Sequence, residues 1–233
     1  MSLPTLLLTR PKAQALPVQT AVQAALGFDV CTVFSPVLQI ERREVAVDLD
    51  RYGGVIVTSV HGVATMNLTG RVAHCVGART AEAALEIGAR QGQVGRDADD
   101  LVEQILSTGT PGPLIHLRGE HTRGDIAARL SSAGIETHEA VVYAQSPLPL
   151  TAPARDLIEG EGVVVLPLYS PRSARLVGQA VDQVGPNVRV IAFSPSVANA
   201  FQVETGRMPD VCATPVGTEM VGAIVAAFHA DIA

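Results

Sequence analysis

Of the 233 residues in the chain, 47% are hydrophobic and 17% are charged. A chain of this length and composition can bury one large core or two cores of roughly 100–120 residues each. The formal net charge is −6 and only 3% of the residues are aromatic, so neither a basic field nor a stacking surface is available for nucleic acid. No apolar run reaches the ~18 residues of a membrane span. We therefore expect neither nucleic acid nor a membrane as a partner.

The cysteines and the N-terminal residues bear on the cellular compartment. Cys31, Cys75 and Cys212 are far apart and form no C-x-x-C pair. We interpret them as small core residues in a reducing compartment, not as a disulfide framework or a zinc site. The N-terminus shows no basic segment followed by an apolar stretch, which is the pattern of a secretory signal. The sequence therefore predicts a cytoplasmic protein.

Short apolar runs alternate along the chain with longer amphipathic stretches. The runs are typical of buried parallel strands, and they comprise residues 6–8, 55–57, 72–76, 114–117, 163–166 and 188–192. Helical patterns between them include residues 12–26, 80–87 and 123–133. A glycine follows each of these patterns, where a left-handed residue commonly ends a helix. This alternation predicts an α/β fold in which a parallel sheet is flanked by helices on both faces.

The order of these strand–helix units repeats once. Residues 6–10 (LLLTR) are similar to residues 114–118 (LIHLR), and residues 53–59 are similar to residues 162–170. We therefore predict two similar lobes. One division of the chain that fits the repeat is a tandem cut near residue 110, in a stretch rich in glycine and proline.

A second division inserts one lobe into the other. Residues 1–35 and 147–233 then form lobe one, residues 42–142 form lobe two, and residues 36–41 and 143–146 are extended linkers marked by proline. The residue patterns alone leave both divisions open.

Short motifs at the ends of the predicted strands span almost the whole chain. They are residues 9–11 (TRP), 57–62 (VTSVHG), 76–81 (VGARTA), 117–120 (LRGE), 142–143 (VY), 169–172 (YSPR) and 213–215 (ATP). In composition and order they resemble the motifs of the uroporphyrinogen-III synthase family. This resemblance implies the inserted division of the chain, with a two-stranded linker joining the lobes and a ligand cleft between them.

The resemblance also implies an activity. The family converts hydroxymethylbilane, a linear tetrapyrrole with eight carboxylates, into uroporphyrinogen III, with loss of water and inversion of the last pyrrole ring. It uses no cofactor and no metal. The implied partner is therefore a small-molecule substrate, and we expect a monomer because no surface pattern indicates a second copy. The resemblance assigns Tyr143 to departure of the substrate hydroxyl, and local packing is the alternative role.

Polar residues follow the predicted strands at the turns into the next helices. Such turns gather at the carboxyl ends of parallel strands, and helix N-termini there favour carboxylates. The residues expected to bind substrate are Arg10, Thr58, Ser59, Gly77, Thr80, Arg118, Ser170, Ser194 and Ser196. Helix capping is the alternative role for the serines and for Thr80, and a surface salt bridge is the alternative for the two arginines.

The sequence departs from the family pattern at one of these turns. Residues 194–198 read SPSVA, with Val197 where the family has a second threonine. Either Ser196 takes over the hydrogen bond of that threonine, or the threonine is dispensable. We interpret His61, in the matched turn at residues 57–62, as a solvated loop histidine.

Two other functions stay open beside the synthase. One is a two-lobed module that binds or senses an anion, because duplicated α/β lobes with a hinge also serve that purpose and a fold does not fix a function. The other is a synthase paralogue that has lost its activity, which the departure at Val197 keeps in consideration.

Overall fold

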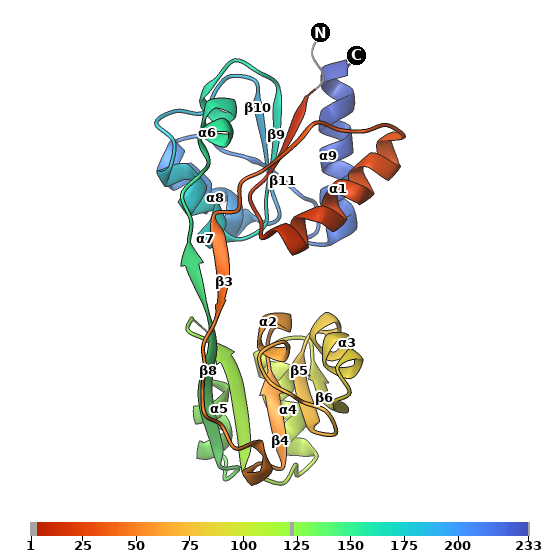
Figure 1. Ribbon diagram of the computed structural model, residues 1–233, viewed down its shortest axis with the longest axis vertical. Helices are drawn as coiled ribbons and strands as arrows, with labels where there is room; N and C mark the ends of the chain where they lie inside the picture. Colours follow the sequence, from red (N-terminus) through yellow and green to blue (C-terminus); the bar gives the residue numbers. More distant parts are fainter. Residues whose placement is uncertain (1–3, 122–123, 233) are drawn as a thin grey trace. The chain divides into compact units, whose positions relative to one another are not determined.

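The chain folds into two α/β units, each built around its own sheet (Figure 1). The computed structural model describes residues 4–121 and 124–232, with the backbone alone at residues 231 and 232. Unit 1 comprises Met1–Gln39 and Pro147–Ala233, and unit 2 comprises Ile40–Ser146. The chain passes from one unit to the other within β3 (Leu38–Arg42) and returns within β8 (Thr137–Pro147). Sheets flanked by helices in two units agree with the fold class that the strand–helix alternation predicts.

Unit 1 holds a five-stranded sheet in the order β11-β10-β9-β1-β2, with parallel pairing throughout. Its strands are β1 (Thr5–Leu8), β2 (Thr32–Phe34), β9 (Val164–Leu168), β10 (Val188–Ala192) and β11 (Asp210–Val211). Its helices are α1 (Lys12–Leu26), α6 (Ala152–Glu159), α7 (Pro171–Gln179), α8 (Pro195–Thr205) and α9 (Gly217–Ile232). Because β1 pairs with β9, the N-terminal strand and the C-terminal half of the chain share one sheet.

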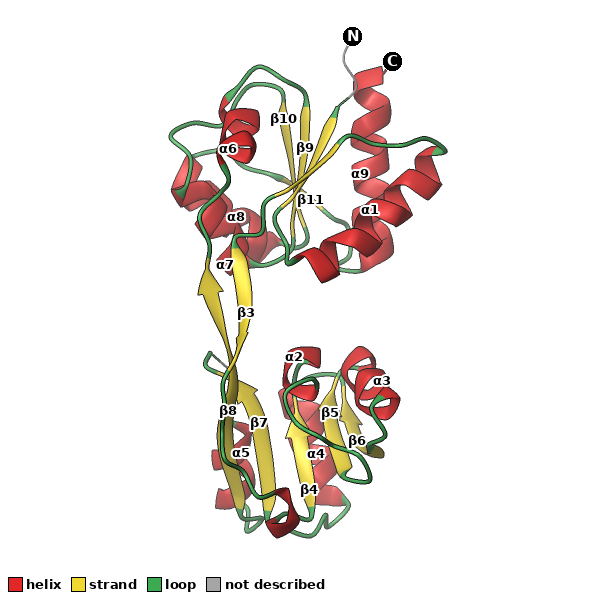
Figure 2. Cartoon of the chain, in the orientation of Figure 1, coloured by secondary structure: helices red, strands yellow, loops and turns green. Residues whose placement is uncertain are grey.

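Alternate residues along the strands of unit 1 pack into two separate cores, one on each face of the sheet. Leu7 packs in the core with α6, α7 and α8, whereas Leu6 and Leu8 pack in the core with α1 and α9. Side chains alternate between the faces of a strand, so an uninterrupted apolar run supplies both cores. Figure 2 shows α1 and α9 on one face of this sheet and α6, α7 and α8 on the other.

Unit 2 holds a six-stranded sheet in the order β3-β8-β7-β4-β5-β6. Its other strands are β4 (Gly54–Val57), β5 (Val72–Val76), β6 (Arg90–Gly95) and β7 (Leu114–Gly119). The strands from β8 to β6 pair in parallel. Its helices are α2 (Val60–Val63), α3 (Ala78–Glu86), α4 (Ala98–Ser107), α5 (Ile126–Ser132) and the short 3-10 helix η1 (Leu49–Arg51).

The sheet of unit 2 also separates two cores. Val55 and Val57 pack with residues of α2 and α3, and Ile56 packs on the opposite face with residues of α4 and α5. The middle of β4 is therefore buried on both faces, as expected for a central strand covered by helices. Among residues 4–121 and 124–232, no helix is long and apolar enough to cross a membrane.

The structure corrects two expectations from the sequence. The helix expected over residues 123–133 is α5, over Ile126–Ser132, and it begins after Asp125, whose φ is 42°; residue 123 lies outside the described part. Cys31 is exposed, not a core residue, because it lies next to β2 at the edge of the sheet. Cys75 and Cys212 are buried as expected, and all three cysteines are free thiols.

Candidate functional site

The residues expected to bind substrate lie at the carboxyl ends of strands in both units. In unit 1 they occupy the turns after β1, β9 and β10, which hold Arg10, Ser170, Ser194 and Ser196. In unit 2 they lie at the ends of β4, β5 and β7, which hold Thr58, Ser59, Gly77, Thr80 and Arg118. Each unit therefore presents one set of polar turns at one edge of its sheet, as the parallel topology requires.

Arg10 lies on the face of an aromatic ring in unit 1. Its guanidinium carbon is 3.9 Å from the centroid of the Tyr169 ring, and its Nη2 donates to Oε1 of Gln14 over 3.0 Å. The Tyr169 ring in turn packs against Phe193, with 5.6 Å between the centroids. The hydroxyl of Tyr169 is buried without a hydrogen-bond partner in the described residues. The Tyr169 ring, supported by Phe193, therefore forms a platform beneath Arg10 that sequence reasoning did not identify.

The two serines that begin helices in unit 1 behave differently. Ser170 caps α7, because its Oγ accepts the backbone N–H of Ser173 over 3.1 Å. Ser194 precedes α8 and makes no side-chain cap; its Oγ lies 3.0 Å from the Oγ of Ser196. The backbone N–H groups at the start of α8 therefore receive no capping side chain from Ser194.

Thr80 and Val197 occupy the same position in their helices. Each is the third residue of its helix, α3 or α8, and each is buried, with 6% and 1% of its surface exposed. The N-cap of α3 is Gly77, so Thr80 is not a capping residue. At α8 the buried position has a methyl group in place of a hydroxyl, and the exposed Ser196 beside it carries the polar group.

The turns of unit 2 that follow β4 and β5 also differ in capping. Ser59 caps the four-residue helix α2 through the N–H of His61, over 3.3 Å. Gly77 begins α3 with φ 81° and ψ 141°, and no side chain caps that helix. A backbone conformation of this kind is open to glycine and strained for other residues. The backbone N–H groups at the start of α3 therefore receive no capping side chain.

Tyr143 is a buried residue of β8, with 8% of its surface exposed. Its ring packs directly on Gly119, where an added Cβ would lie only 2.7 Å from a ring carbon and 2.9 Å from the hydroxyl oxygen. Its backbone carbonyl accepts the N–H of Glu120 over 2.9 Å. Within the described residues the Tyr143 hydroxyl has no hydrogen-bond partner. The ring is therefore held firmly by packing, while its O–H remains available as a donor.

His61 contacts the tyrosine and is not the solvated loop residue that the sequence suggested. It lies in α2, half-buried, and its ring meets the Tyr143 ring edge-on with 5.7 Å between centroids. Burial, together with the nearby positive charge of Arg79, lowers the pKa of His61. The imidazole beside Tyr143 is therefore neutral at pH 7.

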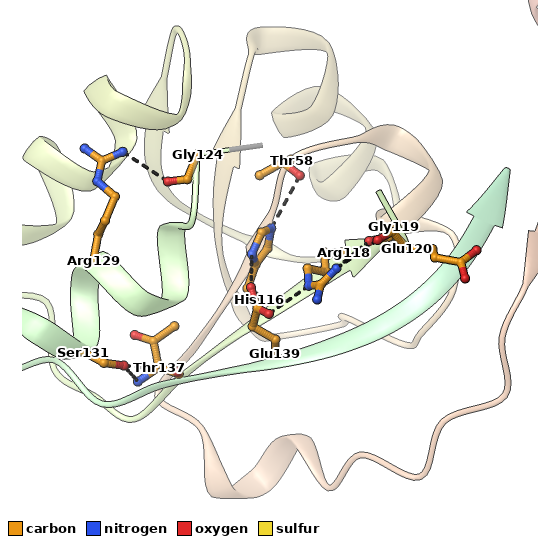
Figure 3. Close-up of polar contacts among 10 residues, drawn as sticks. All are labelled: Thr58, His116, Arg118, Gly119, Glu120, Gly124, Arg129, Ser131, Thr137 and Glu139. Atoms are coloured by element: carbon orange, nitrogen blue, oxygen red, sulfur yellow. Dashed lines mark hydrogen bonds and ion pairs between the residues drawn. The ribbon is translucent and has the colours of Figure 1, made fainter. Parts of the chain in front are cut away.

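Arg118 is fixed by contacts inside unit 2 (Figure 3). Its Nε donates to Oε2 of Glu139 over 2.9 Å, and its Nη1 donates to the carbonyls of Gly119 and Glu120 over 3.0 and 3.3 Å. The salt bridge that was the alternative role of Arg118 is thus present, and its partner lies in the next strand.

A buried histidine continues this row of polar groups. Nδ1 of His116 lies 3.6 Å from Oε1 of Glu139, and its Nε2 lies 3.5 Å from Oγ1 of Thr58. The row therefore runs from Thr58 through His116 and Glu139 to Arg118 (Figure 3). Sequence reasoning missed Glu139, because its register opposite His116 depends on how β8 pairs with β7.

Two histidines are buried within the sheet of unit 2. His74 and His116 both lie opposite Ile56 of β4, on either side of it, with 3% and 1% exposure. Burial lowers the pKa of His74. Burial also lowers the pKa of His116 to about 4, and the charge of Glu139 opposes that shift only in part. Both imidazoles are therefore neutral at pH 7.

Elsewhere in the described residues, a polar pocket has a structural explanation and no metal-binding cluster is found. A pocket at the start of β10 is lined by Arg207, which donates to the carbonyls of Gly185 and Val188 over 2.6 and 2.7 Å and so fastens the loop there. No group of three or more His, Cys, Asp or Glu side chains that could hold a metal ion occurs in residues 4–121 and 124–232.

The family model that matches this chain and the two similar solved structures described below carry the same description. The model of the family described as uroporphyrinogen-III synthase HemD matches residues 20–217. The uroporphyrinogen-III synthetase structure from Helicobacter pylori 26695 is 14% identical, with a TM-score of 0.69 over 97% of this chain and 99% of that one. A mutant uroporphyrinogen III synthase from Thermus thermophilus is 16% identical, with a TM-score of 0.55 over 97% and 99% of the two chains. No curated protein matches the chain. At these identities the similarity to solved structures establishes the fold.

Proposed function

Because the chain belongs to the uroporphyrinogen-III synthase family, we propose that it is an active synthase, a lyase that dehydrates and cyclises hydroxymethylbilane to uroporphyrinogen III. The observation that carries the proposal is the match of the family model to residues 20–217. That range includes every candidate site residue except Arg10. We place the reaction in the cytoplasm and assign it to a monomer that needs no cofactor and no metal.

The first chemical step is loss of the substrate hydroxyl, and Tyr143 is the proposed donor. The C–O bond of the hydroxymethyl group breaks as the pyrrole nitrogen donates electrons into the ring, which gives water and an azafulvene cation. A single weak acid that hydrogen-bonds the departing oxygen is enough for such a leaving group. The phenol of Tyr143 meets this need, because packing on Gly119 and His61 fixes its ring and its O–H has no acceptor in the described residues.

The second task is geometric. Closure through the free α-carbon of the last ring gives the unrotated isomer, so the enzyme must favour attack through the α-carbon that already bears the bridge. The spiro intermediate then breaks the original bridge bond, and the released bridge carbon bonds to the free α-carbon of the same ring, which loses its proton. Holding the two ends of the chain in one orientation is worth several kcal/mol in intramolecular reactions.

We propose that backbone amides and arginines bind the carboxylates of the substrate. The starts of α3 and α8 carry no side-chain caps, so their N–H groups and helix dipoles suit carboxylates. Arg10 adds a guanidinium in unit 1 and Arg118 adds one in unit 2. Local donors of this kind allow a protein of net charge −6 to bind a polycarboxylate.

The decisive experiment is an isomer assay. The purified chain is incubated with freshly generated hydroxymethylbilane, the products are oxidised, and the uroporphyrin isomers are separated by chromatography. We expect mainly type III. Type I alone, formed as fast as in buffer, would mean that the chain does not invert the ring and is a binding module or an inactive paralogue.

A further inference from the structure

The two outer nitrogens of Arg118 differ in their surroundings. Its Nε and both hydrogens of Nη1 are directed at Glu139, Gly119 and Glu120, which uses three of the five donors of a guanidinium. In the part of the chain that the structure describes, Nη2 has no acceptor. Arg118 therefore sits in one fixed orientation with one nitrogen left to donate.

Glu139 is the residue that sets this orientation. It lies on β8 in register with His116 of β7, and its Oε2 accepts from Nε of Arg118. Its other oxygen is 3.6 Å from Nδ1 of His116. Because that histidine is neutral, Arg118 is the charged partner of Glu139. The side chains of Arg118 and Glu139 are 21% and 35% exposed, so the pair is partly shielded from solvent.

A fixed guanidinium suits the proposed reaction better than a mobile one. A long side chain that must be ordered by the ligand loses conformational entropy on binding, and prior ordering removes that cost. Ring inversion also depends on where the substrate carboxylates are held, so a donor with one orientation limits the conformations of the bound chain.

We propose that Glu139 is a positioning residue that holds Arg118 so that Nη2 donates to a carboxylate of the linear tetrapyrrole. This proposal rests on the proposed function, and it adds a residue that contacts no substrate itself. It predicts that Glu139 acts only through Arg118.

A double-mutant cycle tests this dependence. We expect Glu139→Ala to raise KM for hydroxymethylbilane about tenfold while kcat changes less than about twofold, and Glu139→Gln, which keeps an acceptor for Nε, to raise KM by only about twofold. Arg118→Ala should match Glu139→Ala. The double variant should be no worse than Arg118→Ala alone, because the two residues act as a unit.

Glu136→Ala is the matched control. Glu136 lies three residues before Glu139, and Oε1 of its exposed side chain is 3.0 Å from Nε2 of His138, so its loss removes a carboxylate that contacts a histidine without touching Arg118. We expect its KM to equal that of the unmodified chain. Thermal denaturation of every variant checks that the fold is retained.

Three results would overturn the proposal. Additive losses in the double variant would show that Glu139 acts independently of Arg118. A lower KM in Glu139→Ala would show that Glu139 competes with the substrate for the guanidinium. Unchanged KM in both single variants would show that neither residue meets substrate.

Repeating the double-mutant cycle with Kd in place of KM separates the role of Glu139 from the proposed function. Fluorescence titration with uroporphyrin III, the oxidised octacarboxylate form of the product, gives Kd for each variant whether or not the chain turns over substrate. If the chain makes no type III isomer but the Kd values follow the cycle, the proposed function fails and the role of Glu139 stands. If the unmodified chain binds no uroporphyrin, the role of Glu139 is wrong.

Discussion

Tyr143 and Gly119 are paired across β7 and β8, and the ring fits only because the opposite residue has no side chain. A phenol held in this way can be directed at a substrate without the help of a hydrogen bond. His61 supplies a second wall, with its edge toward the ring. The tyrosine thus has the rigidity that a proton donor needs and the open hydroxyl that it must present.

Replacement of Tyr143 by phenylalanine tests that role. The ring stays packed and no hydrogen bond within the described residues is lost, so we expect unchanged thermal stability and a kcat about 100-fold lower, at the low end for general acids because the pyrrole nitrogen assists. Steady-state assays and circular dichroism measure the two quantities. Tyr52→Phe is the control, because the Tyr52 hydroxyl bonds His138 away from the candidate site. Full turnover in Tyr143→Phe would remove the tyrosine from the mechanism.

Tyr169 is a second aromatic residue whose ring and hydroxyl have separable effects. We expect Tyr169→Phe to leave stability unchanged or slightly higher, because the buried hydroxyl has no partner in the described residues. Tyr169→Leu removes the platform under Arg10 and the contact with Phe193, and should lower the free energy of unfolding by about 1–3 kcal/mol and raise KM. Urea denaturation and substrate titration measure both. A large loss of stability in Tyr169→Phe would instead show that the hydroxyl has a structural role.

At the scale of elements, the helix starts divide into capped and uncapped groups. Side chains cap α2, α4 and α7. No side chain caps α1, α3, α5, α6 or α8, and α1, α3 and α8 follow the interior strands β1, β5 and β10. An uncapped start is less stable on its own by about 1 kcal/mol. An anion at the start of any one of these helices would supply the missing cap.

Gly77 gives a direct test of how α3 begins. An added Cβ at Gly77 would meet no atom within 4 Å, so any loss comes from the backbone conformation of φ 81° and ψ 141°. We expect Gly77→Ala to lower the free energy of unfolding by about 1–3 kcal/mol. Gly27, the C-cap of α1 with φ 77° and ψ 10°, provides the comparison. Gly27→Asn should cost less than about 1 kcal/mol, because asparagine tolerates the left-handed region. Equal costs in urea denaturation would contradict this explanation.

At the scale of the whole molecule, the histidines are divided unequally between the units. Five of the six histidines lie in unit 2, and only His229 lies in unit 1. The two buried ones, His74 and His116, have lowered pKa values because of burial. The unfolded chain takes up protons at these positions near pH 6.5, whereas folded unit 2 binds one at His116 only near pH 4. The stability contributed by the neutral histidines is therefore complete above pH 6.5 and is lost as the pH falls toward 4.

This asymmetry predicts that acid opens unit 2 first. Each buried histidine should lower the free energy of unfolding by up to about 1.4 kcal/mol per pH unit in that range. Hydrogen exchange at pH 7 and pH 5, corrected for the intrinsic rate, should show loss of protection in β4, β5 and β7 before β1, β9 and β10. His116→Gln should weaken the pH dependence. Earlier or equal opening of unit 1 would contradict the assignment.

The sequence by itself determined the fold class and the position of the polar turns. Uninterrupted apolar runs such as residues 164–166 can only be buried on both faces, and the polar residues that follow them must gather at one edge of a parallel sheet. The near-repeat of residues 6–10 at residues 114–118 likewise indicated two similar units. These features depend on residues that are close together in the sequence, so the local sequence pattern is enough to predict them.

Only the tertiary structure decided which residues meet. The pairing of Thr5 with Val164 joins two distant segments in one sheet, a contact that the repeat left open. The contacts of Glu139 with Arg118, of Tyr143 with Gly119 and of Arg10 with Tyr169 depend on strand register and on turns far apart in sequence. A shift of one residue in a strand moves every side chain to the opposite face, and nothing in the local pattern around Glu139 fixes its register. Long-range pairing therefore determines which charges and rings meet within each unit.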